Sequence, residues 1–326
     1  KEDLNASEQL PILGNNAWLI AESFEIDPND IKKSHLQIQL ALQGGVNSIR
    51  LHFKNGTPSL LTVLLEGVYL DMIHLHLEGA AVVENPLAWI KAVLELERAE
   101  LSIGTLSAID IDAGFMQEAM SMLPKWSFSG IQIENHQAEV SPATAIAEAM
   151  FGASKQITAL TDYGLSLDEA QRQIHFNLMI DDDYFLSIAR LRTIKRLWLA
   201  LLEAFGAETV FWPKIHVNTS YGEKETPYWD MIAATTQALS AAVAQVYSIE
   251  ICPVSGMEVS NEFARRIARN VQHLLKMESH IDSIIDPAAG SYYIEQYSKA
   301  LSQKAWFLFT NKSNNFVQWW KKLLRQ

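Results

Sequence analysis

Short runs of apolar and β-branched residues alternate with longer amphipathic stretches along most of the chain. Several of the short runs are continuously apolar, which is typical of strands that helices cover on both faces. The expected strands are residues 17–24, 46–53, 70–76, 106–111, 127–134, 174–180, 209–217 and 247–252. Strand and helix alternating in this way predict an α/β fold, a closed eight-stranded parallel β/α (TIM) barrel rather than an open sheet.

Start signals mark several of the helices between these strands. Ser141-Pro142 opens one helix, and Ser166 with Glu169 three residues later predicts a capping box at the start of the next. Three aspartates, 181–183, precede the apolar pattern of a further helix. Negative charge at a helix N-terminus explains them better than a metal site does. Gly44-Gly45 is expected to end a helix and not to form a phosphate loop.

We expect one barrel domain over residues 1–305, followed by a C-terminal helix over residues 306–326. The net charge of −12 argues against a nucleic-acid partner, which requires a basic face. The single cysteine, Cys252, excludes an internal disulfide and a cysteine-clustered metal site. No apolar run approaches the roughly 18–20 residues that span a bilayer, and the start lacks a signal-peptide pattern. We therefore expect a cytoplasmic protein that has no membrane partner.

Polar residues gather where the expected strands end, which is where β/α barrels carry their reactive groups. The set comprises Asp110, Asp112, Glu134, Asn135, His136, His216, Asn218, Thr219 and Ser220. Taken alone, two aspartates and two histidines could form a divalent metal site or a general acid–base pair. The simpler interpretation is a set of satisfied polar groups lining a cavity. His175 and His273 have no acidic partner in the pattern, and we interpret them as packing residues.

Four ordered motifs resemble the methylmalonyl-CoA mutase family, and together they cover nearly the whole chain. They are LPKW at 123–126, GLSLDEAQRQIHFNLMIDDDYFLSIARLRTIKRLW at 164–198, FARRIARN at 263–270, and Glu278-Ser279 followed by DPAAGSY at 286–292. The resemblance implies a β/α barrel from an adenosylcobalamin-dependent isomerase that interconverts methylmalonyl-CoA and succinyl-CoA. In the family's catalytic chain the acyl-CoA lies along the barrel axis, a separate cobalamin domain caps it, and the cofactor performs the radical step.

Groups with which a catalytic chain of this family holds its substrate are missing or changed. The first strand, from Trp18 to Phe24, offers neither the tyrosine nor the arginine of the family's RQY motif. Asp110 stands where the resemblance places a substrate-binding glutamine, and no arginine occurs between Ala113 and Leu123, where the carboxylate-binding loop belongs. A substrate carboxylate left unpaired in a dry site costs on the order of several kcal/mol. The comparison therefore predicts that this chain does not bind the substrate productively.

Other counterparts survive in altered form. His136 and Glu139 keep an H-x-x-E spacing, His216 and Asn218 lie in HVNTSY where the family has H-x-QTSG, and Glu278 resembles the glutamate of an ESG motif. The residues of a vestigial pocket are then Asp110, Glu134, Asn135, His136, Glu139, His216, Asn218 and Glu278. We expect none of them to be catalytic, and we expect no bound metal.

The cobalamin-ligating D-x-H-x-x-G motif does not occur in the chain. The cobalamin-binding domain is therefore expected to be absent from it, and adenosylcobalamin is expected in the holoenzyme but not ligated by this chain. The resemblance implies a non-catalytic small subunit that pairs with a large catalytic mutase subunit in a heterodimer. Two alternatives stay open. One is a divergent barrel enzyme with an acid–base or metal site at Asp110, Asp112, Glu134, His136 and His216, and the other is the trimmed barrel of a longer cobalamin-binding protein.

Overall fold

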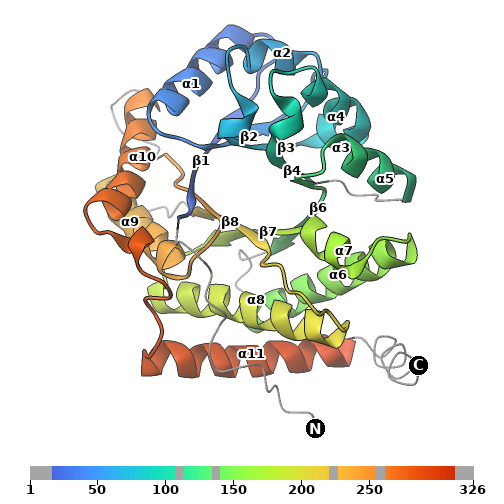
Figure 1. The fold of residues 1–326 in the computed structure, drawn as a ribbon. Helices are drawn as coiled ribbons and strands as arrows, with labels where there is room; N and C mark the ends of the chain where they lie inside the picture. Colours follow the sequence, from blue (N-terminus) through green and yellow to red (C-terminus); the bar gives the residue numbers. More distant parts are fainter. Residues whose placement is uncertain (1–16, 108–112, 134–139, 220–226, 254–260, 313–326) are drawn as a thin grey trace.

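The sheet of the computed structural model is a nearly closed parallel barrel surrounded by helices (Figure 1). The structure describes residues 17–107, 113–133, 140–219, 227–253 and 261–312. The strands are β1 Leu19–Glu25, β2 Ser48–His52, β3 His74–Glu78, β4 Ile103–Leu106, β5 Trp126–Ser127, β6 Ser129–Ile133, β7 Ile174–Ile180, β8 Lys214–Thr219 and β9 Ser248–Glu250. They are hydrogen-bonded in the order β5-β4-β3-β2-β1-β9-β8-β7-β6. The predicted β/α barrel is confirmed.

The barrel closes through one interrupted strand. β5 pairs with β4 at one edge of the sheet and β6 pairs with β7 at the other, and only Phe128 separates β5 from β6 in the chain. The Phe128 backbone N–H donates to the side-chain oxygen of Gln173 at 3.3 Å, and its ring packs on Phe115. The nine strands therefore occupy eight positions around the barrel, and the predicted fifth strand, 127–134, is the interrupted one.

The main helices are α1 Ile31–Gln43, α2 Leu60–Leu64, α3 Ala80–Glu84, α4 Pro86–Leu94, α5 Ala113–Met122, α6 Pro142–Asp162, α7 Leu167–Gln173, α8 Tyr184–Ala204, α9 Pro227–Val243, α10 Asn261–Met277 and α11 Tyr292–Lys312. In Figure 1, α11 lies outside α8, as a second layer on that side of the barrel. Helix α11 includes residue 305, where the barrel domain was expected to end, and this domain boundary stays a prediction. Within the described ranges, no helix has the length and apolar character needed to cross a membrane.

The predicted helix starts are confirmed. The Ser141 hydroxyl accepts a hydrogen bond from the Thr144 backbone N–H, and Ser166 and Glu169 form the capping box. The carboxylate of Asp183 accepts from the Leu186 backbone N–H at 3.0 Å and so caps α8. The other two aspartates of that run also have partners, because Asp181 lies 3.6 Å from Arg190 and Asp182 accepts from Gln237.

Three predicted strands are displaced by several residues. The prediction for 70–76 was wrong at its start, where Leu70–Met72 is a 3-10 turn, and β3 begins at His74. The prediction for 209–217 was wrong before residue 214, because Pro213 follows the apolar run Val210–Trp212 and has no N–H for a strand ladder. The fourth strand was expected at 106–111, but β4 is Ile103–Leu106, and residues 108–112 lie outside the described part of the chain.

The apolar core lies between the strands and the helices. Large pairs such as Phe53 with Trp89 and Phe176 with Trp198 fill this outer shell. One charged group also faces outward, since buried Glu22 of β1 accepts hydrogen bonds from two α10 arginines, Arg265 and Arg269, at 2.7 and 2.8 Å. Because side chains alternate along a strand, the residues between these positions point into the barrel.

Candidate functional site

The side chains that point into the barrel are mostly polar or charged, although barrel interiors usually hold branched aliphatic residues. Only the residues within the described ranges are considered. Those that meet inside the barrel are Arg50, His74, His76, Glu78, Thr105, Ser107, Ser127, His175, Asn177, Lys214, His216, Ser248 and Glu250. Most of them are buried. A polar interior of this kind is where a site would be sought.

Side chains from opposite strands meet on the barrel axis. Arg50 of β2 donates from Nη2 to Oδ1 of Asn177 on β7, at 3.3 Å. His74 of β3 and His216 of β8 have ring centroids 5.3 Å apart. In both pairs three strands intervene in the sheet order, so the partners stand across the barrel from each other. The four side chains are at most 7% exposed. Direct contacts therefore cross the axis at two places, and we call these two contacts the axial crossing.

Four histidines form a cluster around the axial crossing. Ring centroids lie 5.7 Å apart for His76 and His216, and 5.9 Å apart for both His76–His175 and His175–His216. Together with His74 these rings fill the middle of the barrel. His175 was predicted to be a packing residue, and the structure places it in this polar cluster.

Hydroxyl groups share hydrogen bonds with three of the four rings. The pairs are Thr105 with His76, Ser107 with His175 at 3.1 Å, and Ser248 with His216 at 2.7 Å. Both nitrogens of His74, Nδ1 of His175 and Nε2 of His216 have no hydrogen-bond partner among the described residues. In the same part of the chain, no group of three or more histidine, cysteine, aspartate or glutamate side chains is arranged to hold a metal ion.

The cluster is electrically neutral at physiological pH. Burial lowers the pKa of His74, His175 and His216 well below the usual histidine value. The charge of Arg50 and the neighbouring histidines lower it further, as does the charge of Lys214 for His74 and His175. Burial also lowers the pKa of His76. Neutral histidine rings can donate hydrogen bonds to hydroxyl groups and accept hydrogen bonds from them, but they do not attract an anionic substrate.

Arg50 carries a positive charge inside the barrel and stands between two carboxylates. Its nitrogens lie 3.8 Å from Glu78 and 3.9 Å from Glu250. Burial alone would raise the pKa of Glu78, but the hydrogen bond with His76 and the charge of Arg50 together lower it to about 2. Burial raises the pKa of Glu250. The Arg50 guanidinium is thus held by the carboxylates of Glu78 and Glu250 and, across the axis, by Asn177.

Five of the eight predicted pocket residues lie outside the described part of the chain, namely Asp110, Glu134, Asn135, His136 and Glu139, and so does Asp112 of the alternative site. His216 lies in the histidine cluster, and Asn218 follows two residues later on β8. Glu278 is exposed after the end of α10. It lies toward the N-terminal end of the barrel strands, because Lys276, two residues before it, donates to the backbone oxygen of Trp18, just before β1. The structure does not bring Glu278 to His216.

Sequence reasoning missed Arg50, His74 and His76 as interior residues. The available signal was the alternation of polar and apolar residues in SIRLH of β2 and HLHLE of β3. In a closed barrel every second residue of a strand faces the axis.

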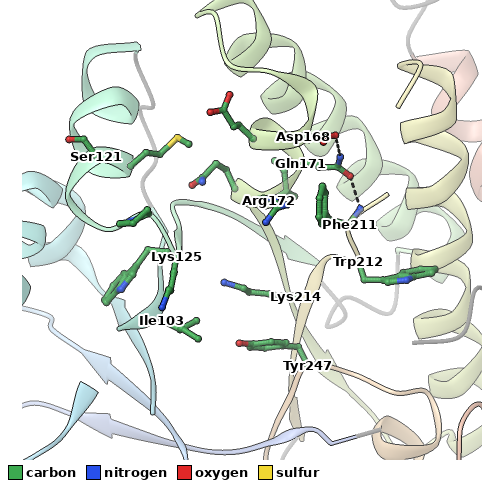
Figure 2. Close-up of a pocket in the computed structure, with 16 residues that line it drawn as sticks. Ile103, Ser121, Lys125, Asp168, Gln171, Arg172, Phe211, Trp212, Lys214 and Tyr247 are labelled. Atoms are coloured by element: carbon green, nitrogen blue, oxygen red, sulfur yellow. Dashed lines mark hydrogen bonds between the residues drawn. The ribbon is translucent and has the colours of Figure 1, made fainter. Parts of the chain in front are cut away.

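A pocket of about 830 Å³ opens at the N-terminal mouth of the barrel, and we call it the mouth pocket (Figure 2). Its wall includes the first residues of four strands, Ile103, Trp126, Ile174 and Lys214. Figure 2 shows Lys214 and Tyr247 extending into this space. Burial lowers the pKa of Lys214 to about 8 and raises the pKa of Tyr247 to about 12.

One wall residue of the mouth pocket, Tyr247, contacts the histidine cluster. The ring of Tyr247 lies edge-on against His74 and His216, with centroid distances of 5.3 and 5.4 Å. Tyr247 therefore joins the pocket wall to the axial crossing. A molecule that entered at this mouth would meet bulky side chains before it reached the C-terminal end of the strands.

Comparison with known proteins identifies the family of this chain. The model of the family described as methylmalonyl-CoA mutase matches residues 97–314. The probable methylmalonyl-CoA mutase small subunit of Mycobacterium tuberculosis (strain H37Rv) is 29% identical over 322 residues, covering 90% of this chain and 52% of that protein. The small subunit from Porphyromonas gingivalis is 30% identical, covering 70% and 34%. That from Propionibacterium freudenreichii subsp. shermanii is 27% identical, covering 89% and 49%.

The chain spans about half the length of the first of these relatives. The family model matches well over half of the chain, in a segment that begins before β4 and ends after α11. The chain belongs to the methylmalonyl-CoA mutase family.

Proposed function

We propose that this chain is the barrel region of a non-catalytic small subunit of a methylmalonyl-CoA mutase. The observation that carries the proposal is the axial crossing, in which Arg50 meets Asn177 and His74 meets His216. In the catalytic chains that the sequence resembles, the acyl-CoA lies along the barrel axis. Here that path is occupied by side chains of the protein, so a thioester entering at the N-terminal mouth does not reach the far end of the barrel.

Opening the axis would be costly. It would separate Arg50 from Asn177 and disturb the two carboxylates beside it, Glu78 and Glu250. Breaking a buried ion pair by removing one partner costs about 3–5 kcal/mol. A ligand would have to offset a penalty of this size before making any contact of its own. The closed axis is therefore the stable state of this barrel.

The first strand supports the same conclusion. Because Glu22 faces the α10 arginines, its neighbours Ala21 and Ser23 face the axis. Neither side chain can replace the tyrosine that the resemblance places on this strand. The described first strand therefore lacks this substrate-binding group even where the axis is considered open.

The proposed partner is a large catalytic mutase subunit, with which this chain forms a heterodimer in the cytoplasm. Its support is the printed description of the relatives from M. tuberculosis, P. gingivalis and P. freudenreichii as small subunits. In this proposal the small subunit stabilises the large one, which interconverts methylmalonyl-CoA and succinyl-CoA.

Adenosylcobalamin is assigned to the large subunit, because the histidines on the barrel axis of this chain do not fit it. The four histidines of the cluster are at most 2% exposed, so none presents a ring nitrogen to a planar corrin. His52, at the C-terminal end of β2, lies 3.6 Å from Glu78 and is held by it. The family's ligating motif is also missing from the sequence.

The test is co-expression of the chain with a tagged large subunit from the same organism, followed by purification and a mutase assay of each chain alone and of both together. The expected result is that the two chains co-purify, and that this chain alone gives no succinyl-CoA from methylmalonyl-CoA with added adenosylcobalamin. Turnover by the isolated chain would overturn the proposal.

A His216→Asn variant separates the proposal from the divergent-enzyme alternative. His216 is the one residue of that alternative site within the described ranges. In the proposed role, His216→Asn leaves the activity of the purified heterodimer unchanged. If the isolated chain turned over a substrate and lost that activity with His216→Asn, the alternative site would be supported instead.

A further inference from the structure

We propose that Lys214 is a covalent binding site, at which its amine forms an imine with small aldehydes that carry a carboxylate or a phosphate. The side chain extends from β8 into the mouth pocket and is half-buried there (Figure 2). Nζ of Lys214 donates to the Ser127 hydroxyl at 3.2 Å and lies 5.8 Å from the ring centroid of Tyr247. Within the described ranges, no carboxylate forms an ion pair with it. The amine can therefore be reached from the pocket and is not held by a counter-charge.

The surroundings of Lys214 favour the neutral amine, which is the nucleophilic form. Burial lowers the pKa of Lys214 to about 8. At pH 7.5 about a quarter of a group with this pKa is neutral, against about one in a thousand for an ordinary lysine. Nearby groups keep one state around this pH, because burial lowers the pKa of His74 and His175 well below 6.5 and raises that of Tyr247 to about 12. A desolvated lysine is a common starting point for imine formation.

Imine formation needs only the amine and the aldehyde. The Nζ lone pair attacks the carbonyl carbon, and one N–H proton moves to the carbonyl oxygen to give a carbinolamine. Loss of its hydroxyl group together with the second N–H proton, as water, leaves the C=N bond. The Ser127 hydroxyl lies within hydrogen-bond distance of Nζ and can pass the first proton to the oxygen. No oxidant, reductant or metal takes part.

The pocket wall offers a preformed place for a flat anion. The guanidinium of Arg172 lies over the Phe211 ring, 3.6 Å from its centroid, and Lys125 lines the same space. The Gln171 side chain fixes this wall, because it accepts from the Phe211 backbone N–H and donates to the Thr209 backbone oxygen, both at 2.9 Å. Arginine and lysine bind carboxylates and phosphates through charge-assisted hydrogen bonds. The ring and the two cations therefore suit an aromatic or planar aldehyde that carries negative charge.

The acids of the wall do not cancel these cations. Glu169 closes the capping box with Ser166, and Asp168 accepts from the Gln171 side chain. Both acids lie in the first turn of α7, where the helix N-terminus compensates negative charge. The cations at 125 and 172 form no ion pair with a described residue.

Labelling of the full chain at pH 7.5 tests the proposal. The probe is 4-formylbenzoate, its uncharged control is 4-formylbenzamide, and borohydride reduction fixes each imine for peptide mass spectrometry. Formylbenzoate is expected to label Lys214 at least ten-fold more than exposed Lys32, and several-fold more than formylbenzamide does. Lys195 is the internal control for pKa alone, since burial lowers its pKa to about 7, but it is only 4% exposed and donates to two backbone oxygens. It is expected to stay unlabelled.

Variants separate the pocket from simple amine reactivity. Lys214→Met is expected to remove the main product, and K125Q/R172Q is expected to lower formylbenzoate labelling of Lys214 several-fold more than formylbenzamide labelling. K32Q/K33Q is the matched control, with both lysines exposed, and circular dichroism checks the fold of each variant. The rate of labelling at Lys214 is expected to level off above about pH 8. Labelling spread evenly over exposed lysines, equal labelling by the two aldehydes, or an equal loss for both in K125Q/R172Q would overturn the proposal.

Discussion

Acidification is expected to destabilise this protein in a pH range where most globular proteins remain stable. The perturbation is protonation of His74, His175 and His216, which are neutral in the folded barrel because burial lowers the pKa of each well below 6.5. In the unfolded chain each ring takes up a proton near pH 6.5. Below that pH the unfolded state binds more protons than the folded state, so the free energy of unfolding falls as the pH falls.

The magnitude follows from the number of groups. One histidine that titrates only in the unfolded state, with a pKa near 6.5 there, contributes about 1 kcal/mol between pH 6.5 and 5.5, so three contribute about 3 kcal/mol. Glu250 opposes them, because its raised pKa makes the folded state bind its proton more tightly, by at most about 1.4 kcal/mol per pH unit. The net loss is about 2–3 kcal/mol, a sizeable share of a total stability of about 5–15 kcal/mol.

Lysines do not account for a change in this window. Burial lowers the pKa of Lys195 to about 7 and of Lys214 to about 8, so the stability linked to them is lost as the pH falls from about 10.5 toward those values. That loss is largely complete above pH 6.5. The pKa of Glu78, about 2, gives a loss only below about pH 4.5. The interval from pH 6.5 to 5.5 therefore reports on the histidines.

The assay is urea unfolding at pH 7.5, 6.5 and 5.5, followed by circular dichroism. His74→Leu removes a ring whose two nitrogens have no partner among the described residues, and it is expected to remove about one third of the pH dependence. His280→Asn is the control, because His280 is exposed and its φ of 52° is a conformation that asparagine tolerates. Equal stability at pH 7.5 and 5.5, or equal effects of the two variants, would refute the reasoning.

Four substitutions away from the axis have separate expected outcomes. Glu22→Gln is expected to lower the free energy of unfolding by about 3 kcal/mol in urea titration, because two α10 arginines lose a buried counter-charge; an unchanged midpoint would contradict this. Ser166→Ala is expected to cost about 1 kcal/mol through loss of the capping box, measured by the same titration. Gly79→Ala is expected to lower the free energy of unfolding by more than about 1 kcal/mol, since the φ of Gly79 is 109° and the new Cβ would lie 2.3 Å from the Phe53 carbonyl oxygen. Gly164→Ala places its Cβ in open space and is expected to cost less.

Strand positions could be predicted where the apolar run and the strand coincide. The sixth expected strand, 174–180, has the bounds of β7. The capping box at Ser166 marks the start of α7, which ends directly before the strand, and the apolar run of the strand is itself buried. The fourth was misplaced because β4 includes Gly104, which weakens a strand pattern. In the structure a Cβ at Gly104 would lie 2.5 Å from the Trp126 ring. The reason for that glycine lies in a neighbouring strand, where a local pattern does not reveal it.

The site could be predicted only in part, for a related reason. Sequence reasoning looked for polar groups where strands end, and it found His216 and Asn218 there. Arg50 and His76 lie inside strands, where alternating polar residues are equally typical of a strand with one face in water. Closure of the sheet turns that polar face inward. Closure depends on Trp126 to Ile133 pairing at both edges, which only the whole fold determines.

The axial crossing closes the axis, and it does not by itself close the C-terminal end of the barrel. In the proposed role, turnover along the route of the catalytic chains needs both an open axis and substrate-holding groups; Arg50 with Asn177 removes the first, while Ala21 and Ser23 remove the tyrosine position of the second. These two grounds are independent, because one concerns β2 and β7 and the other concerns β1. A single substitution at Arg50 would therefore not create a mutase. Chemistry confined to the C-terminal end would use a different substrate and no threaded thioester, so its detection would argue for the divergent enzyme and not for a restored one.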